Sequence, residues 1–401
     1  MPKKLPLKQY LIVFLMAAGF NASAQSKKTS GFLLQNEQQL SVFKKQYHAG
    51  DPAISNQIKS LLADADKELA AGPYSVTFHK TRVAPSGNPH DYVSQAPYWW
   101  ADPSKPDGKP YIRKDGERNP EIYLLHDDSQ LNDLCRAVKK LGFAYYFTGD
   151  EQYAQKATGL MRTWFIDTAT KMAPNFNYAQ YIPGINDGRG IGIIESRALA
   201  VIPDALAMMQ GSTSMPADLK TGVKHWFAEY LEWLQKSKNG NEERQARNNH
   251  GTFYDVQVVD FALFTGNDKL AREVLQIRTI ARIDTQFAAD GRQPLELERT
   301  RSWNYSNMNL TGWSMLATLA DRVDIDLWHT EKQGRGIKKC IEWIMPYLLK
   351  QKDWPYKQIE PISYGETLTI CSLAEEKYPG IDFKKVFTMY PRPKPWGDEH
   401  H

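Results

Sequence analysis

Two short polar segments of the sequence carry side chains that could perform chemistry. The first is Arg247–His250 (Arg-Asn-Asn-His), at the start of a predicted helix, and the second runs from Glu298 to Tyr305, ahead of another helix. Neither has a metal-ligand spacing, and the chain contains no H-E-x-x-H, C-x-x-C, G-x-S-x-G or phosphate-loop motif. Zinc hydrolysis, acyl-enzyme chemistry and nucleotide use therefore have no basis in the sequence. We expect chemistry by polar side chains alone, with no metal and no cofactor.

These residue types suit β-elimination across C4 and C5 of a 4-linked uronate sugar. The C5 proton is weakly acidic until the neighbouring carboxylate is neutralised, because its removal pushes negative charge onto the carboxylate oxygens. Hydrogen-bond donors at those oxygens stabilise the charge, and losing one such donor commonly costs about a hundredfold or more in rate. Asn249, His250 and Arg299 are suitable donors.

Tyr305 could act both as the base that takes the C5 proton and as the acid that protonates O4. Both atoms lie on one face of the ring in β-mannuronate and β-glucuronate. A free tyrosine titrates near pH 10, and an opposite charge within about 4 to 6 Å lowers a pKa by roughly 1 to 3 units. Arg299 or Arg301 could supply that charge. Because six residues of ideal helix turn through about 600°, Arg299 and Tyr305 can meet one substrate only if the segment between them is partly loop.

Each of these side chains also has a structural interpretation. Asn248 or Asn249 is a good helix cap, and His250 could be satisfied within a first helical turn. Arg299 could form a surface ion pair with Glu298, and Tyr305 could be a core aromatic residue. Taken singly, Asn249 and His250 are more simply structural, whereas the joint pattern favours catalysis.

The elements that must position these residues are mainly amphipathic helices. Apolar residues recur at three- and four-residue spacing, strand-like alternation is scarce, and Gly and Pro collect between the helices. The chain is therefore predicted to be helix-dominated with long functional loops. The predicted helices are Ile54–Ala71, Ser129–Thr148, Glu151–Thr168, Glu195–Gln210, Ala217–Lys238 and Asp268–Ala289.

A short motif that occurs twice in the sequence predicts repeated helical hairpins. Phe147–Asp150 (Phe-Thr-Gly-Asp) and Phe264–Asn267 (Phe-Thr-Gly-Asn) each end one apolar helix and open another. In both, Gly can end the first helix in a left-handed turn, and Asp or Asn can cap the next. Repeated hairpins favour a toroid of helix pairs over an ordinary bundle in which this turn arose twice.

Two long loops, Pro85–Pro120 and Pro174–Gly192, interleave aromatic with polar and cationic residues. Aromatic rings offer flat apolar faces for sugar rings, and cations offer partners for carboxylates. Any single tryptophan in these loops is more simply explained as a structural residue that packs over the end of a helix. The interleaving in several loops favours a carbohydrate groove.

The N-terminus has the layout of a cleavable secretory signal over residues 1–24. Three lysines precede the apolar run Leu11–Phe20, and Ala22-Ser23-Ala24 forms the cleavage site. Because the run is shorter than the roughly 20 residues that span a bilayer, no membrane insertion is expected. No cysteine follows the cleavage site, which predicts a secreted periplasmic or extracellular protein. The mature chain, residues 25–401, is interpreted as one domain.

Charge and cysteines narrow the function classes further. Removing residues 1–24 takes away three lysines and lowers the formal net charge from +4 to +1. A nucleic-acid partner is therefore not expected, and any anionic partner must bind to a local group of positively charged residues. Cys135, Cys340 and Cys371 lie far apart in helix-like apolar patterns, which predicts buried free thiols. Nothing in the sequence indicates the oligomeric state.

These motifs together resemble the alginate lyase domain of helical-toroid polysaccharide lyases. The motifs are Asn-Asn-His at 248–250, the Glu296–Arg301 run with Tyr305, Asn-Tyr-Ala-Gln at 177–180, and the Gly-rich run 188–195. The likeness covers about residues 74–367. It is similar to polysaccharide lyase families five and thirty-eight, and motif order resembles the latter most. Family five has one more residue between the equivalents of Arg299 and Tyr305, so its exact geometry is not transferred.

The resemblance implies an all-α (α/α) toroid, an incomplete barrel of helical hairpins whose long loops form a substrate groove. It implies that Asn249, His250 and Arg299 neutralise a carboxylate and that Tyr305 is the combined base and acid in syn elimination of a β-1,4-linked uronate polymer such as polymannuronate, giving 4,5-unsaturated ends. Implied groove residues are Tyr98, Trp99, Trp100, Arg113, Asn177, Tyr178, Gln180, Arg189 and Arg301.

Three alternatives remain open at this point. The polymer could be β-1,4-glucuronan, since mannuronate and glucuronate differ at C2, away from the bond broken. A helical-toroid hydrolase of unsaturated uronides could recruit paired carboxylates. A catalytically silent polysaccharide-binding protein is the third. The carboxylates available to a hydrolase are Asp187, Glu195, Glu296 and Glu298.

Overall fold

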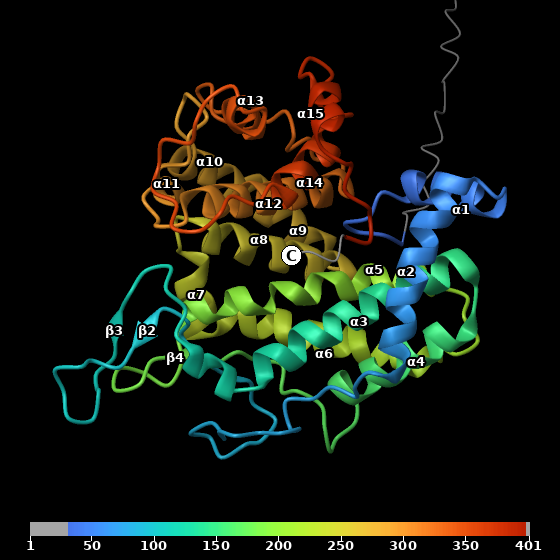
Figure 1. The fold of residues 1–401 in the computed structure, drawn as a ribbon. Helices are drawn as coiled ribbons and strands as arrows, with labels where there is room; N and C mark the ends of the chain where they lie inside the picture. Colours follow the sequence, from blue (N-terminus) through green and yellow to red (C-terminus); the bar gives the residue numbers. More distant parts are fainter. Residues whose placement is uncertain (1–30, 398–401) are drawn as a thin grey trace, which may run out of the picture. The chain divides into compact units, whose positions relative to one another are not determined.

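The computed structural model describes residues 31–397, which are built mainly from helices (Figure 1). These residues fall in one compact unit. The predicted signal peptide, residues 1–24, lies outside the described residues. No helix within residues 31–397 combines the length and the apolar character needed to cross a membrane.

Helices and short strands alternate along the chain in the following order. The N-terminal part contains α1 (Glu37–His48), α2 (Pro52–Ala70), β1 (Val93–Gln95), β2 (Trp99–Trp100), β3 (Ile112–Arg113), η1 (Pro120–Leu124), α3 (Asp127–Thr148), α4 (Glu151–Phe165), β4 (Tyr178–Tyr181), η2 (Gly190–Val201) and α5 (Ile202–Met208). The remainder contains α6 (Ala217–Lys236), α7 (Lys238–Arg244), α8 (Asn249–Thr265), α9 (Asp268–Glu273), η3 (Val274–Thr279), α10 (Ile280–Gln286), α11 (Pro294–Leu297), α12 (Ser302–Asp321), α13 (Ile337–Leu348), α14 (Gly365–Ala374) and α15 (Phe383–Met389).

The two predicted hairpin turns are confirmed. Gly149 follows α3 at φ 71°, and the Asp150 side chain caps α4 by accepting from the backbone N–H of Gln152. Gly266 follows α8 at φ 86°, and the Asn267 side chain caps α9. Because glycine adopts positive φ without a steric cost, each turn reverses the chain within a few residues.

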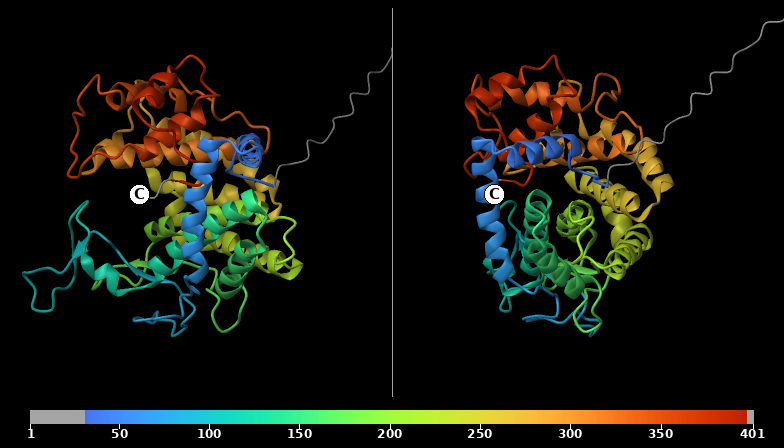
Figure 2. Two further views of the ribbon diagram at one scale, coloured as in Figure 1. Left: turned by 45° about the vertical axis from the view of Figure 1, so that its right-hand side comes forward. Right: turned by 90° about the vertical axis from the view of Figure 1, so that its right-hand side faces the viewer.

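The hairpins form an inner and an outer layer of helices. The inner elements pack in sequence order: α3 against α5, η2 against α8, α8 against α12, and α12 against α14. In both views of Figure 2 the C-terminal helices, orange to red, lie on one side of the yellow helices, and the green helices lie on the other. Nearly every residue of α8 is buried, as expected for a helix that is covered on all sides.

Two predicted helices have a different internal geometry. The predicted Glu195–Gln210 helix begins as the 3-10 helix η2 and becomes α-helical only at α5, where Pro203, which has no N–H to donate, occupies the first turn. The predicted Asp268–Ala289 helix contains the six-residue π-helical segment η3 between α9 and α10. Nothing in the structure explains the π-helical segment.

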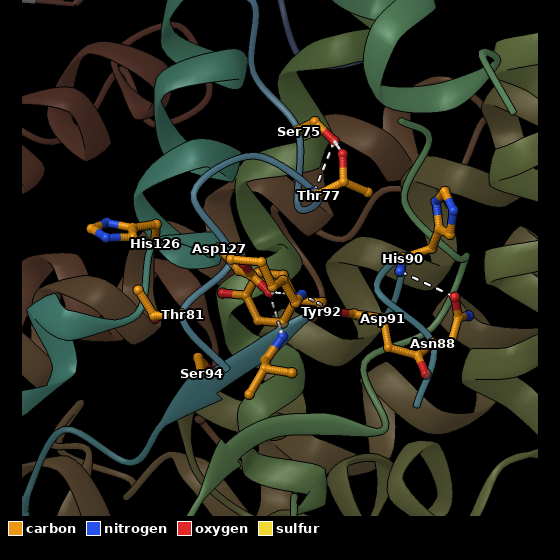
Figure 3. Close-up of polar contacts among 12 residues, drawn as sticks. Ser75, Thr77, Thr81, Asn88, His90, Asp91, Tyr92, Ser94, His126 and Asp127 are labelled. Atoms are coloured by element: carbon orange, nitrogen blue, oxygen red, sulfur yellow. Dashed lines mark hydrogen bonds and ion pairs between the residues drawn. The ribbon is translucent and has the colours of Figure 1, made fainter. Parts of the chain in front are cut away.

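Short strands and polar contacts fix the long loops onto the helices. β1 pairs in parallel with β4, and β2 pairs with β3 in antiparallel fashion. At the start of α3, Asp127 accepts from the backbone N–H of Val93 at 2.8 Å and from Nζ of Lys80 (Figure 3). These contacts hold β1 against the first turn of α3.

The core is made from the facing sides of both layers. Large side chains such as Trp164, Tyr230, Phe227 and Trp313 are fully buried there. Cys135, Cys340 and Cys371 are buried free thiols, as predicted.

Candidate active site

A cleft of about 920 Å³ opens where the first turns of α8 and α12 meet the β2–β3 loop. In Figure 1 this loop, drawn in cyan, lies on the same side of the molecule as α7 and α11. The cleft brings together residues that are far apart in the sequence. Ten predicted site residues line it: Tyr98, Trp99, Arg113, Gln180, Arg189, Asn249, His250, Arg299, Arg301 and Tyr305.

Tyr305 lies in the first turn of α12 and is 9% exposed. Its hydroxyl is 2.8 Å from the hydroxyl of Tyr98, and the guanidinium of Arg299 lies 3.7 Å from the centre of its ring. Residues 298–301 between α11 and α12 are not helical. The prediction that a partly looped segment brings Arg299 and Tyr305 together is therefore confirmed.

The pKa of Tyr305 shifts in the direction opposite to the one expected from the sequence. Burial raises it well above the usual tyrosine value, and the neighbouring Tyr98 hydroxyl adds to the increase. Arg299 does lower the pKa of Tyr305, but its effect is smaller than that of burial. Tyr305 is therefore a neutral phenol at rest, with a proton to give.

Asp115 fixes the orientation of Arg299 from the loop that follows β3. Its carboxylate accepts from Nε and Nη2 of Arg299 at 3.2 and 2.8 Å and also from the backbone N–H of Thr300. Burial pushes the pKa of Asp115 upward, but the hydrogen bonds and charge of Arg299 outweigh it and hold the pKa at about 2. Asp115 therefore remains ionised and keeps the guanidinium above the Tyr305 ring.

Glu296 holds Asn249 at the first position of α8. The backbone N–H and the side-chain Nδ2 of Asn249 donate to the two carboxyl oxygens of Glu296 at 2.6 and 2.7 Å. Asn249 is completely buried, and its Oδ1 has no hydrogen-bond partner among the described residues. Because an amide nitrogen carries two hydrogens, Nδ2 retains one donor after binding Glu296.

Glu243 of α7 holds His250. Nδ1 of His250 lies 2.7 Å from Oε1 of Glu243, and the Glu243 side chain is only 2% exposed. With Nδ1 engaged, Nε2 is the ring nitrogen left to face the cleft that His250 lines.

The floor of the cleft is a buried hydrogen-bond network under β1 and η2. The hydroxyls of Tyr92 and Ser94 both donate to Glu195, at 2.9 and 2.5 Å, and Tyr92 also contacts Asp128. Burial and the neighbouring Asp128 raise the pKa of Glu195 to about 8. Tyr92 and Ser94 project from the chain beside Asp127 in Figure 3. Gln180 joins this network through its backbone N–H, which donates to Ser94.

Three predicted groove residues lie outside the cleft lining. Trp100 donates from Nε1 to the backbone oxygen of Glu117, and Asn177 accepts from Nε1 of Trp233. Tyr178 packs on the small apolar cluster beneath β1 and β4. Their side chains therefore support the loops around the cleft.

The carboxylates that a hydrolase would recruit do not form a facing pair. Glu296 accepts a hydrogen bond from Asn249, and Glu195 accepts one from Tyr92 in the buried network. Asp187 and Glu298 are exposed and lie outside the cleft lining. The four carboxylates named from the sequence therefore do not supply the facing pair that a hydrolase needs.

Sequence reasoning missed the residues that hold the predicted ones in place, namely Asp115 and Glu243. Neither stands in a recognisable motif. Within residues 31–397, no group of three or more His, Cys, Asp or Glu side chains is arranged to hold a metal ion. The cleft therefore combines a neutral phenol with amide, imidazole and guanidinium donors.

Comparison with known proteins identifies the family. A family model described as alginate lyase matches residues 75–354. The crystal structure of an alginate lyase from Bacteroides ovatus is 39% identical, with a TM-score of 0.87, over 92% of this chain and 97% of that one. Alginate lyase A1-III from Sphingomonas species A1 is 18% identical, with a TM-score of 0.54, over 89% and 92% of the two chains. A variant of that lyase complexed with tetrasaccharide is 18% identical, with a TM-score of 0.58, over 94% and 95%.

No curated protein matches the chain. The more distant structures show that the fold is shared, and the predicted (α/α) toroid is thereby confirmed. The family match spans more than half of the chain, and the Bacteroides structure aligns with nearly all of it. The chain therefore belongs to the alginate lyase family and is a polysaccharide lyase.

Proposed function

We propose that this enzyme cleaves β-1,4-linked mannuronate in alginate by syn β-elimination, without a metal ion. The single observation that carries the proposal is the position of the Tyr305 hydroxyl, in a cleft lined by Asn249, His250 and Arg299. The similar structures of alginate lyases, one of them complexed with tetrasaccharide, support the same substrate class.

In the proposed reaction, three donors neutralise the uronate carboxylate. Nδ2 of Asn249, Nε2 of His250 and the guanidinium of Arg299 are arranged by Glu296, Glu243 and Asp115 respectively. These supporting carboxylates fix the donors before substrate arrives, so little reorganisation is needed when charge develops on the carboxylate oxygens.

Tyr305 then exchanges one proton for another. The C5–H bond breaks and its proton goes to the phenolic oxygen, while the phenolic proton passes to O4. The C4–O4 bond breaks and a C4=C5 double bond forms. Because the raised pKa keeps Tyr305 protonated, the acid needed for the leaving oxygen is present from the start.

The decisive experiment mixes the enzyme, with chelator present, with polymannuronate, polyguluronate and glucuronan. Ultraviolet absorbance of an unsaturated product is expected with polymannuronate. Tyr305→Phe should lower the rate by about 10²- to 10⁴-fold, because it removes both proton transfers and leaves the ring in place. Tyr123→Phe, at a tyrosine that is 68% exposed, is the matched control.

Other outcomes of this experiment would overturn parts of the proposal. Product from glucuronan alone would reassign the polymer, and product that disappears with chelator would require a metal. Binding without product from any polymer would indicate a silent binding protein. Full activity of Tyr305→Phe would remove the proposed mechanism.

We also propose export through the segment 1–24, on the basis of its sequence alone. N-terminal sequencing of the protein recovered from periplasm or medium should begin at Gln25. A protein that retains Met1 in those fractions would contradict this processing site.

A further inference from the structure

Arginines are concentrated in the cleft, and they differ in how their charge is compensated. The cleft is lined by Arg113, Arg118, Arg189, Arg197, Arg299 and Arg301. Arg113 and Arg299 share the carboxylate of Asp115. Arg301 forms an ion pair with Glu360 at 2.5 Å. Arg189 donates from Nη2 to the Gln180 side chain at 2.7 Å.

The remaining two, Arg118 and Arg197, form no ion pair within 4.0 Å in the described part of the chain. Arg197, on η2, makes one long hydrogen bond of 3.3 Å to the backbone oxygen of Ile194. Both side chains are exposed to solvent. Because each also lines the cleft, this exposure faces the space that a substrate would fill.

Arg118 and Arg197 act on each other as like charges. The surrounding cleft walls partly desolvate Arg197 and lower its pKa, although the side chain remains open to the cleft, and the charge of Arg118 lowers the pKa further. Arg118 lines the same cleft from the loop after β3, which is anchored where the adjacent Asn119 donates from Nδ2 to the backbone oxygen of Trp99. Two guanidinium groups in mutual repulsion are stabilised by an anion that can accept from both.

Three carboxyl groups also face Arg197: Glu366, Asp128 and Glu195. Burial raises the pKa of Glu366, and burial together with Asp128 raises that of Glu195 to about 8. These shifts favour the protonated forms of Glu366 and Glu195, and Asp128 also accepts from Nδ2 of Asn132 at 3.1 Å. Within residues 31–397 none of the three carboxyl groups comes within 4.0 Å of either guanidinium, so both arginines keep donors for a ligand in the cleft.

We infer that Arg118 and Arg197 form a second carboxylate-binding subsite, which holds a uronate residue other than the one that reacts at Tyr305. This inference rests on the proposed function, since it assumes a polyuronate in the cleft. It goes further because the enzyme would bind two carboxylates of the polymer at once. One lies at Asn249, His250 and Arg299, and the other lies at the Arg118–Arg197 subsite. A neutral sugar at the second position would leave both arginines without a partner.

The test separates binding at this subsite from the chemical step. Arg197→Gln and Arg118→Gln are each expected to raise KM for polymannuronate at least tenfold while kcat changes less than threefold. Arg197→Lys should recover part of the loss, because it restores the charge. Arg272→Gln removes a surface arginine of α9 that is exposed and outside the cleft lining, and should leave both constants unchanged.

A second measurement uses substrate chemistry. Polymannuronate in which part of the carboxyl groups is reduced to alcohols should be cleaved more slowly than the intact polymer. This loss of activity should be larger for the wild type than for Arg197→Gln. In the Tyr305→Phe background, calorimetry with a saturated mannuronate oligosaccharide should show weaker binding when Arg118 or Arg197 is replaced.

Failure of the inference and failure of the proposed function give different results. Wild-type activity together with an unchanged KM and unchanged oligosaccharide binding in both Gln variants would overturn the second subsite alone. Absence of unsaturated product from every uronate polymer would overturn the proposed function, while calorimetry would still decide whether these arginines bind mannuronate. A fall in kcat with unchanged KM would assign them to the chemical step and overturn the inference.

Discussion

The hydroxyl groups of Tyr98 and Tyr305 lie 2.8 Å apart, although the two residues are separated by 207 positions in the sequence. Tyr98 comes from the loop ahead of β2, and Tyr305 from the first turn of α12. Burial raises the pKa of Tyr305, and the contact with Tyr98 raises it further. The loop thus helps to keep the phenol protonated.

Tyr98→Phe should therefore change the pH dependence of the reaction. Without the second hydroxyl, the pKa of Tyr305 falls, so the phenolic proton is lost at lower pH. The alkaline limb of the kcat profile should move to lower pH, while kcat at neutral pH should change less than tenfold, because the phenol keeps its proton there. Steady-state rates across the pH range measure both effects, with Tyr123→Phe as control. An alkaline limb that stays in place would contradict the link between the two hydroxyls.

Glu243→Gln should weaken catalysis through His250. The variant keeps the shape of the side chain but removes the charge that fixes Nδ1 of His250. Loss of one hydrogen-bond donor to the developing charge commonly lowers the rate about a hundredfold. Because this variant keeps His250 and loses only its fixed orientation, kcat should fall by about ten- to a hundredfold, with a smaller change in KM. Glu229→Gln is a matched control, since Glu229 contacts His225 at 3.4 Å on the exposed surface of α6. Equal effects of the two variants would show that Glu243 does not position His250.

Asp260→Asn should stabilise the fold at neutral and alkaline pH. Asp260 is completely buried in α8, and neither carboxyl oxygen has a hydrogen-bond partner among the described residues. Burial raises its pKa well above the usual value, and Asp204 adds to the increase. The folded state therefore keeps a proton that the unfolded chain loses above about pH 4, so stability falls as pH rises from there.

Denaturant unfolding of Asp260→Asn should show a gain of at least about 1 kcal/mol at pH 8 that shrinks toward pH 4. Asp353→Asn, at an exposed aspartate, controls for the change of charge. A gain that is independent of pH would indicate that the carboxyl group is not the source of the difference.

Much of the fold could be predicted from the sequence because the outer helices are amphipathic. α2, α4 and α6 have one buried face and match the predicted ranges closely. α8 and α12 have buried residues on nearly all sides, so periodicity could not define them. The polar residues at their first turns marked where they begin.

The reactive side chains could be predicted because they cluster in two short segments. Their supports could not, since Asp115 reaches Arg299 across 184 positions and Glu296 reaches Asn249 across 47. The sign of the Tyr305 pKa shift also depends on burial. Nearby arginines can be read from a sequence, whereas desolvation by distant segments cannot.

The contact between Asp115 and Arg299 couples the loop after β3 to the candidate active site. The same carboxylate ties the loop after β3 to residues 299 and 300 and orients the guanidinium above the Tyr305 ring. Any outward swing of the loop that breaks this contact also frees Arg299 from its working position. The position of this loop and the position of the Arg299 guanidinium are therefore coupled through one carboxylate.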